Sequence, residues 1–120
     1  MPFCVVLISA PQGEVAEKLG RMLVEEKLAA CVNLVPQVKS VYWWEGKVTE
    51  SDETLLIAKT DKLKVKGLIK AVKAAHPYSV PEVISLRIKE GNRDYLRWIA
   101  ESLGTPPKKQ RAPKGAKPLA

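Results

Sequence analysis

The spacing of apolar residues changes from segment to segment along this chain, and that change limits the folds available to it. The run FCVVLIS, at 3–9, is almost wholly apolar, which predicts a central strand buried on both faces. In GEVAEKLGRMLVEEKLA, at 13–29, apolar residues instead recur every three or four positions, as they do on one face of a helix. The residues predicted to make that face are Val15, Leu19, Met22 and Leu23.

A second amphipathic helix is expected after residue 60. Asp61 is a suitable N-cap, and the apolar positions that follow it again have helical spacing. Pro77 disfavours helical geometry in the residue before it, so the helix should stop at His76 and His76 should be extended. The core-facing residues predicted for this helix are Val65, Leu68, Ile69 and Val72.

Between the two helices, the sequence predicts a long antiparallel hairpin. The segment CVNLVPQVKSVYWWEGKV, at 31–48, alternates loosely and is apolar on both sides, so both of its faces need cover. We expect this strand to close at EGK, the chain to turn at TESDE and the second strand to follow in TLLIAKT. Pro36 cannot donate to a ladder and should lie at a bulge or an edge. A strand of this length would reach about 50 Å, far beyond the sheet of a small domain.

The remaining segments complete the order β-α-β-β-α-β and add a helix. A strand is predicted to begin at Pro81, in PEVISLRI, and a last helix to run from the N-cap Asn92 to Gly104. This order is that of an α+β, ferredoxin-like split β-α-β fold with an antiparallel sheet. We therefore expect one such domain over 1–104, with the C-terminal helix as an addition to the fold.

The net charge of +7 is concentrated at the C-terminal end of the chain. Segment 105–120 holds five of the 20 basic residues and no acidic one, which leaves 15 basic against 13 acidic residues elsewhere. Because it is rich in Pro and Lys and has almost no apolar residue, we expect it to be a disordered basic tail. It either binds an acidic partner or is only a solvated terminus, and its composition favours the second reading.

Several classes of protein are disfavoured. No apolar run approaches the ~20 residues that span a bilayer and no address precedes the first strand, so we expect no membrane association and a cytoplasmic location. The chain has no nucleophile elbow, P-loop, HExxH or dinucleotide motif, so we expect a binding protein and not an enzyme. RNA-recognition domains share this fold but stack bases on aromatic residues of the first and third strands, where this chain has only Phe3. Nucleic-acid binding is therefore disfavoured too.

Three motifs, LAACVNLVPQVKSVYWWEGKV, HPYSVPEVISL and GNRDYLRWI, resemble in order and spacing those of the CutA family, the divalent-cation tolerance proteins. The resemblance covers about residues 3–103. It implies a ferredoxin-like protomer, a homotrimer built by the long hairpins, and a link to tolerance of copper and other divalent metals. The family's trimer is also similar to that of the PII signalling proteins, which implies an alternative: a trimer that senses a small ligand and has no dedicated metal site.

The resemblance makes His76, the only histidine, a candidate metal ligand. Bacterial members of the family have copper ligands assigned at a cysteine of the first strand and at two adjacent histidines before a Pro-Tyr pair; here those positions are Ile8, Ala75 and His76. Since one of the three is retained, we expect weak binding of copper or another divalent cation, with Glu82 as a second ligand. Alternatively, His76 only ends its helix and bonds the last carbonyl groups.

The second candidate site is a ligand cleft at a subunit boundary. Lys59, at the close of the third strand, and Tyr78 are predicted to line it together with Glu82. Tyr42 and Trp44, on the long strand, either stack on a ligand there or pack against another subunit. Cys4 and Cys31 are too few and too far apart for a disulfide framework, and they either bind a soft metal or serve as small core residues.

Overall fold

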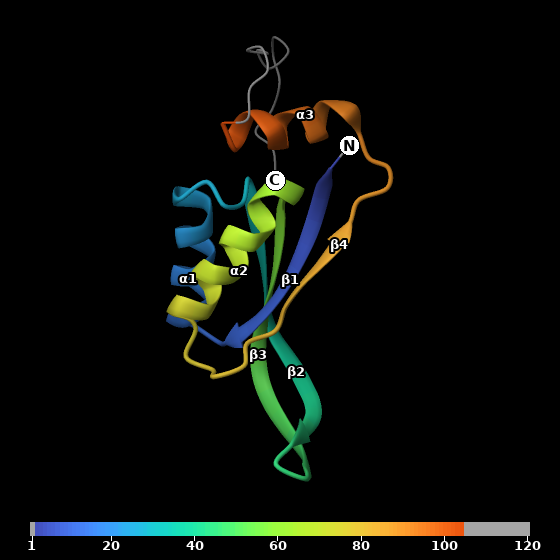
Figure 1. The fold of residues 1–120 in the computed structure, drawn as a ribbon. Coiled ribbons are helices and arrows are strands. Elements are labelled where there is room, and N and C mark those ends of the chain that lie inside the picture. The colour runs from blue at the N-terminus through green and yellow to red at the C-terminus, as the bar shows by residue number, and fades with distance from the viewer. Residues whose placement is uncertain (1, 105–120) are drawn as a thin grey trace.

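The computed structural model describes residues 2–104 (Figure 1). The elements in chain order are β1 (Phe3–Pro11), α1 (Glu14–Glu25), β2 (Cys31–Trp44), β3 (Lys47–Asp61), a 3₁₀ turn (Lys62–Lys64), α2 (Val65–Ala75), β4 (Val83–Arg87) and α3 (Arg93–Ser102). This is the predicted order β-α-β-β-α-β followed by a helix. The predicted tail at 105–120 lies outside the described residues, as does Met1.

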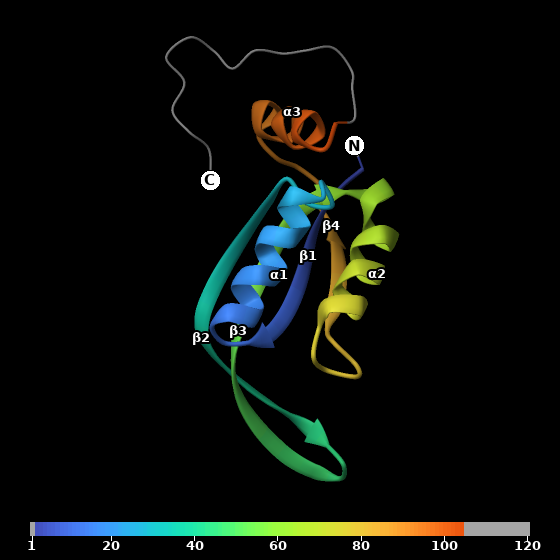
Figure 2. The same cartoon turned by 90° about the vertical axis from the view of Figure 1, so that its left-hand side faces the viewer.

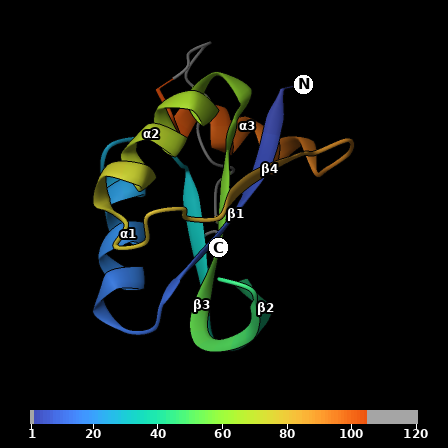
Figure 3. The ribbon, with the colours of Figure 1, turned by 60° about the horizontal axis from the view of Figure 1, so that its bottom comes forward.

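The four strands form one antiparallel sheet in the order β2-β3-β1-β4. β1 lies in the middle, where Leu7 pairs with Ile57 of β3 on one side and with Ile84 of β4 on the other. Both α1 and α2 cover the same face of the sheet, and α3 crosses one end of it, near the N-terminus (Figures 2 and 3). The predicted ferredoxin-like α+β fold is therefore confirmed.

The main core lies between the sheet and the helices α1 and α2. Along β1, Val6 and Ile8 point toward the helices and are fully buried, whereas the alternate residues point to the other face. Val15 was expected to pack on the sheet but is exposed, because the apolar face of α1 is turned so that Ala16 occupies the buried position. The helical residues buried in this core are Ala16, Leu19, Leu23, Leu68 and Val72. A smaller core under α3 holds Phe3, Ile99 and Leu103.

The long hairpin of β2 and β3 projects beyond the rest of the molecule, away from α3 (Figure 1). Its turn is not at TESDE, as the sequence suggested, but at Glu45 and Gly46, which join Trp44 directly to its partner Lys47. Both turn residues have positive φ, 50° and 79°, as a two-residue hairpin turn of type I′ requires. The prediction failed because polarity alone indicates a turn poorly, and TESDE is instead paired with β2 along its whole length.

The predicted irregularity at Pro36 is confirmed. The register of β2 against β3 shifts between Val35 and Val38, so Pro36 falls where no ladder bond is required of it. The next residue, Gln37, has φ 60°, and its backbone N–H donates to Oε1 of Gln12 at 3.2 Å. This bulge marks the point at which the hairpin leaves the body of the domain.

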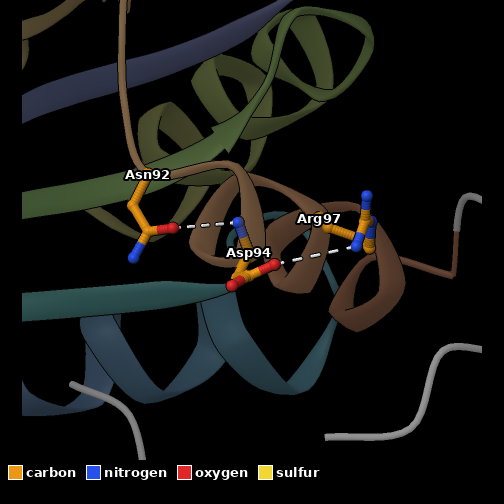
Figure 4. A network of polar contacts seen from close by, with 3 residues as sticks. All are labelled: Asn92, Asp94 and Arg97. Carbon is orange, nitrogen blue, oxygen red and sulfur yellow. Dashed lines mark hydrogen bonds and ion pairs between the residues drawn. The ribbon is translucent and has the colours of Figure 1, made fainter. Parts of the chain in front are cut away.

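The predicted helix ends agree with the structure. Asp61 accepts a 2.6 Å bond from the backbone N–H of Leu63 and so caps the 3₁₀ turn that leads into α2. Asn92 caps α3 by accepting from the N–H of Asp94 at 3.0 Å, and Arg97 lies 3.7 Å from the Asp94 carboxylate (Figure 4). Gly104 follows α3 with φ 72°. The start of the fourth strand differs from the prediction, since β4 begins at Val83 and not at Pro81.

The sheet face opposite α1 and α2 is covered by a helix only at one end, where α3 packs on Phe3; within residues 2–104 no helix lies over the rest of it (Figures 1 and 2). Its side chains are mostly apolar, and several at its edges are strongly exposed. They extend from the open face along the hairpin, where Trp43 is 75% and Trp44 50% exposed. The open face carries Val5, Leu7, Val35, Leu55, Ile57, Ile84 and Leu86.

Candidate functional site

His76 lies directly after α2 and has the extended backbone that the sequence predicted, with φ −83° and ψ 138°. Its side chain is buried, at 7% exposure, and does not bond the last carbonyl groups of the helix. Nε2 lies 2.7 Å from the carbonyl oxygen of Ser9, and Nδ1 accepts a 3.1 Å bond from the N–H of Tyr78. A carbonyl only accepts and an N–H only donates, so these two contacts require the neutral tautomer with the proton on Nε2. Both ring nitrogens are therefore engaged within the chain.

A cavity of about 650 Å³ opens where the hairpin meets the segment after α2. Tyr42, Trp44, Tyr78 and Glu82, all predicted site residues, line this cavity together. His76 does not line the cavity itself, but its Nε2 contacts the carbonyl oxygen of Ser9, which does. The hydroxyl of Ser9 in turn donates to Oε1 of Glu82 at 3.3 Å. The sequence did not identify the other lining residues, which are Ser9, Ser40, Val41, Glu53, Ser79 and Val80.

Glu53 is the most buried charged group in the cavity wall, at 4% exposure. Its Oε2 accepts a 2.9 Å bond from the hydroxyl of Tyr78. Burial first, and then this bond to the Glu53 carboxylate, raise the pKa of Tyr78 to about 12, because an ionised phenol would be poorly hydrated and would face a negative charge. On the hairpin, the hydroxyls of Tyr42 and Ser51 lie 2.6 Å apart. The two tyrosines are thus held in position by polar partners.

Lys59, which was predicted to line the cleft, does not line this cavity of the protomer. It pairs with Cys31 near the opposite end of β3, and its ammonium group hydrogen-bonds Oδ1 of Asn33 and lies 3.9 Å from the Cys31 thiol. The physical reason is the direction of β3, which carries its last residues away from the hairpin base toward α3. Tyr95 of α3 lies beside the same thiol, and its pKa is raised, mainly by burial.

The two cysteines are both free. Cys4 is buried, as expected of a small core residue, whereas Cys31 is half-buried and has Lys59 and Asn33 as polar neighbours. Among residues 2–104, no three His, Cys, Asp or Glu side chains converge where they could hold one metal ion. A metal bound to this protomer would therefore need water or a second protomer to complete its ligands.

Residues 4–102 match the family model described as CutA1 divalent ion tolerance protein. The chain belongs to the CutA1 family. The match includes every helix and strand except the first residue of β1, so the resemblance recognised in the three sequence motifs is confirmed.

Individual CutA1 proteins agree with this assignment. The "Divalent-cation tolerance protein CutA" of Thermus thermophilus is 52% identical over 100 residues, covering 83% of this chain and 97% of that protein. Its solved structure has a TM-score of 0.82. "Protein CutA 1, chloroplastic" of Oryza sativa is 50% identical over 85% of this chain, which spans only 58% of the rice protein. The structure of the "Periplasmic divalent cation tolerance protein CutA" of Archaeoglobus fulgidus is 40% identical, with a TM-score of 0.82, over 84% of this chain and 98% of that one.

Within residues 2–104 of this CutA1 chain, no helix is both long and apolar enough to cross a bilayer. The related proteins named above carry chloroplastic and periplasmic designations, so membership of the CutA1 family does not fix one compartment.

Proposed function

We propose that this chain forms a cytoplasmic homotrimer that binds ligands without catalysis, acts in divalent-cation tolerance and binds a divalent cation weakly. The observation that carries the proposal is the group formed by His76, Ser9 and Glu82. In this group, the only histidine of the sequence and an accessible carboxylate each form a hydrogen bond with Ser9 of β1. The family's name supplies the link to divalent cations.

Trimer formation is supported by the apolar surface that the protomer leaves uncovered. Ile84 and Leu86 on the open sheet face are about half exposed, at 50% and 53%, and the hairpin projects into solvent with its tryptophans. Exposed apolar surface of this extent is typical of an interface between subunits. A closed ring of identical protomers would cover the open face and the hairpin of each chain with the same surfaces of its neighbours.

Weak metal binding is expected because His76 must break a hydrogen bond within the chain before it can coordinate a cation. To coordinate a cation, one ring nitrogen must release either the Ser9 carbonyl or the Tyr78 N–H, and a buried group left without its partner costs about 1–3 kcal/mol. Glu82 is exposed and already accepts a bond from Ser9, so it offers a carboxylate oxygen at low cost. We therefore expect a dissociation constant for Cu²⁺ in the micromolar range or weaker, about −8 kcal/mol or less favourable.

Isothermal titration of Cu²⁺ into wild type, His76→Gln and Glu82→Gln tests the metal proposal. Each variant should bind Cu²⁺ at least about tenfold more weakly than wild type, a difference of about 1.4 kcal/mol. The matched control is Glu50→Gln, which neutralises an exposed carboxylate on the hairpin outside this group. If His76→Gln and Glu82→Gln bind Cu²⁺ as tightly as wild type does, these residues are not the ligands.

A second candidate function, sensing of a small ligand by a PII-like trimer without a dedicated metal site, is favoured by one observation. The cavity at the base of the hairpin has a volume of about 650 Å³, within the usual range for small-molecule sites. Its wall combines aromatic faces with fixed polar groups, a combination that orients small molecules. In this second function, the ligand would contact Tyr42, Trp44 and Tyr78. Lys59 would not contact it, because Lys59 does not line the cavity.

A further inference from the structure

The charges in the wall of the cavity are all of one sign. Glu53 and Glu82 are the two ionisable carboxylates among its lining residues, and within the described chain no lysine, arginine or histidine lines it. Lys47 lies directly across the hairpin from Trp44, and Lys39 pairs with Glu50 at 3.7 Å, but neither lines the cavity. Two carboxylates around one space attract positive charge, and the buried Glu53 is screened by solvent less than the exposed Glu82 is.

One carboxylate oxygen of Glu53 is hydrogen-bonded within the described chain and the other is not. Its Oε2 accepts from Tyr78, whereas Oε1 accepts from no donor in the described residues. Every buried side-chain polar atom in the described chain has a partner, so the unpartnered Oε1 of Glu53, a residue of the cavity wall, is not fully buried. A carboxylate in a residue only 4% exposed, with a free oxygen on a cavity, is oriented to accept a charge-assisted hydrogen bond from a bound molecule.

The rest of the wall suits an organic cation better than a bare metal ion. The rings of Tyr42, Trp44 and Tyr78 line the cavity, and aromatic rings attract an alkylammonium group and pack against its carbon chain. A hard divalent ion would instead need about six oxygen ligands close to one point. Ser9, Ser40 and Ser79 add hydroxyl groups that accept the remaining N–H bonds of an ammonium group.

We propose that the cavity between the hairpin and the segment after α2 binds a small alkylammonium ion, with its charged end at Glu53 and Glu82 and its carbon chain against the aromatic wall. This inference rests on the second candidate function, ligand sensing, and identifies the chemical class of the ligand. It does not require His76 to bind a metal.

The test uses the intact protein with butylammonium chloride as the probe. Butan-1-ol and sodium butyrate serve as its neutral and anionic analogues. Isothermal titration should show saturable binding of butylammonium and at least about tenfold weaker binding of both analogues. In amide spectra of ¹⁵N-labelled protein, the indole N–H signal of Trp44 should shift, while those of Trp43 and Trp98 should not. If butan-1-ol binds as tightly as butylammonium does, or if butylammonium binding does not saturate, the inference is overturned.

Variants locate the charged end of the ligand. Glu53→Gln and Glu82→Gln should each weaken butylammonium binding at least about fivefold. Since Glu53 is buried and its loss could affect folding, the exposed Glu82 gives an independent measurement. The control Glu50→Gln keeps the overall charge of those variants but changes a residue outside the cavity, and it should bind as wild type does. Equal weakening in all three variants would mean that only the general field of the protein attracts the probe, and would overturn the inference.

Titration of Cu²⁺ in parallel separates this inference from the metal proposal. Binding of butylammonium without binding of Cu²⁺ contradicts only the metal site. Binding of Cu²⁺ alone, with no response of the Trp44 indole to butylammonium, contradicts only the inference made here. If another subunit fills the cavity in the assembled protein, neither the probe nor its analogues will bind, and that outcome also overturns the inference.

Discussion

The imidazole Nε2 of His76 donates to the backbone carbonyl oxygen of Ser9 across 2.7 Å, and so connects the end of α2 to β1, an inner strand of the sheet. The Nδ1 atom of the same ring accepts from the N–H of Tyr78. One buried side chain therefore fixes both the end of the helix and the start of the segment that lines the cavity. This dual contact explains a histidine before proline at this position without any metal.

The first prediction is that His76 contributes to folding as well as to any ligand binding. His76→Ala should lower the free energy of unfolding by about 2–3 kcal/mol, because it leaves the Ser9 carbonyl and the Tyr78 N–H without partners and opens a space. Urea unfolding at one fixed protein concentration measures this. Lys73→Ala, an exposed change on the same helix, should stay within about 0.5 kcal/mol of wild type. Equal stability of all three proteins would contradict the structural role.

The second prediction concerns stability at high pH. Folding raises the pKa of Tyr78 from 10.0 to about 12, so the folded state holds this proton more tightly than the unfolded state does. The stabilisation is fully present below the unfolded value and is lost as the pH rises from about 10 to about 12. Tyr78 is 37% exposed, so solvent screening reduces the effect to roughly 1 kcal/mol.

Unfolding of wild type and Tyr78→Phe in urea, at about pH 9 and about pH 11.5, isolates this effect. The difference in stability between the two proteins should shrink at the higher pH, since the variant has no phenol at position 78 to titrate. Tyr42→Phe removes a neighbouring phenol that is the smallest of the causes of the raised Tyr78 pKa, but it keeps the bond between Tyr78 and Glu53, and should retain most of the wild-type decline. A difference between wild type and Tyr78→Phe that is independent of pH would rule out the linkage.

Much of this fold could be predicted because the features concerned are local. The bulge at Pro36, the caps at Asp61 and Asn92, and the extended His76 each follow from the chemistry of one or two neighbouring residues. The helix periods also needed no tertiary information. Among the residues predicted to lie on the core-facing side of the first two helices, only Val15 is exposed, because a helical pattern does not fix the last few tens of degrees of rotation about the helix axis.

The candidate site could be predicted only in part, because it depends on strand register. Alternation shows which face of a strand a residue occupies, but not how far along the sheet it lies. Lys59 and Glu53 both point to the open face, yet only Glu53 reaches the cavity. Placing the turn at Glu45 and Gly46, a pair with Gly in the second position between two strand-like runs, would have brought Glu53 into β3 and opposite Val38.

The third prediction follows from that turn. Glu45 has φ 50°, which a glutamate adopts at a cost and an asparagine adopts readily. Glu45→Asn should therefore raise the free energy of unfolding by about 0.5 kcal/mol. Gly46→Ala should lower it by about 1 kcal/mol through backbone strain alone, since no atom lies within 4 Å of the added methyl group. A destabilised Glu45→Asn protein would show that the turn has a different geometry.

The last prediction is that the hairpin holds the proposed trimer together. Trp44 is half exposed in the protomer and lies next to the turn of the projecting hairpin, where a neighbouring chain would pack against it. Light scattering should give wild type a mass near three times the 13.3 kDa protomer. Trp44→Asp should shift the protein toward monomer, because a charge desolvated in an interface costs several kcal/mol where a buried ring stabilises it.

Leu63→Asp is the matched control: Leu63 is 78% exposed but lies in the 3₁₀ turn, outside the hairpin and the open face, so this variant should stay trimeric. A trimeric Trp44→Asp protein would place the interface elsewhere, and a monomeric wild type would remove the proposed assembly altogether.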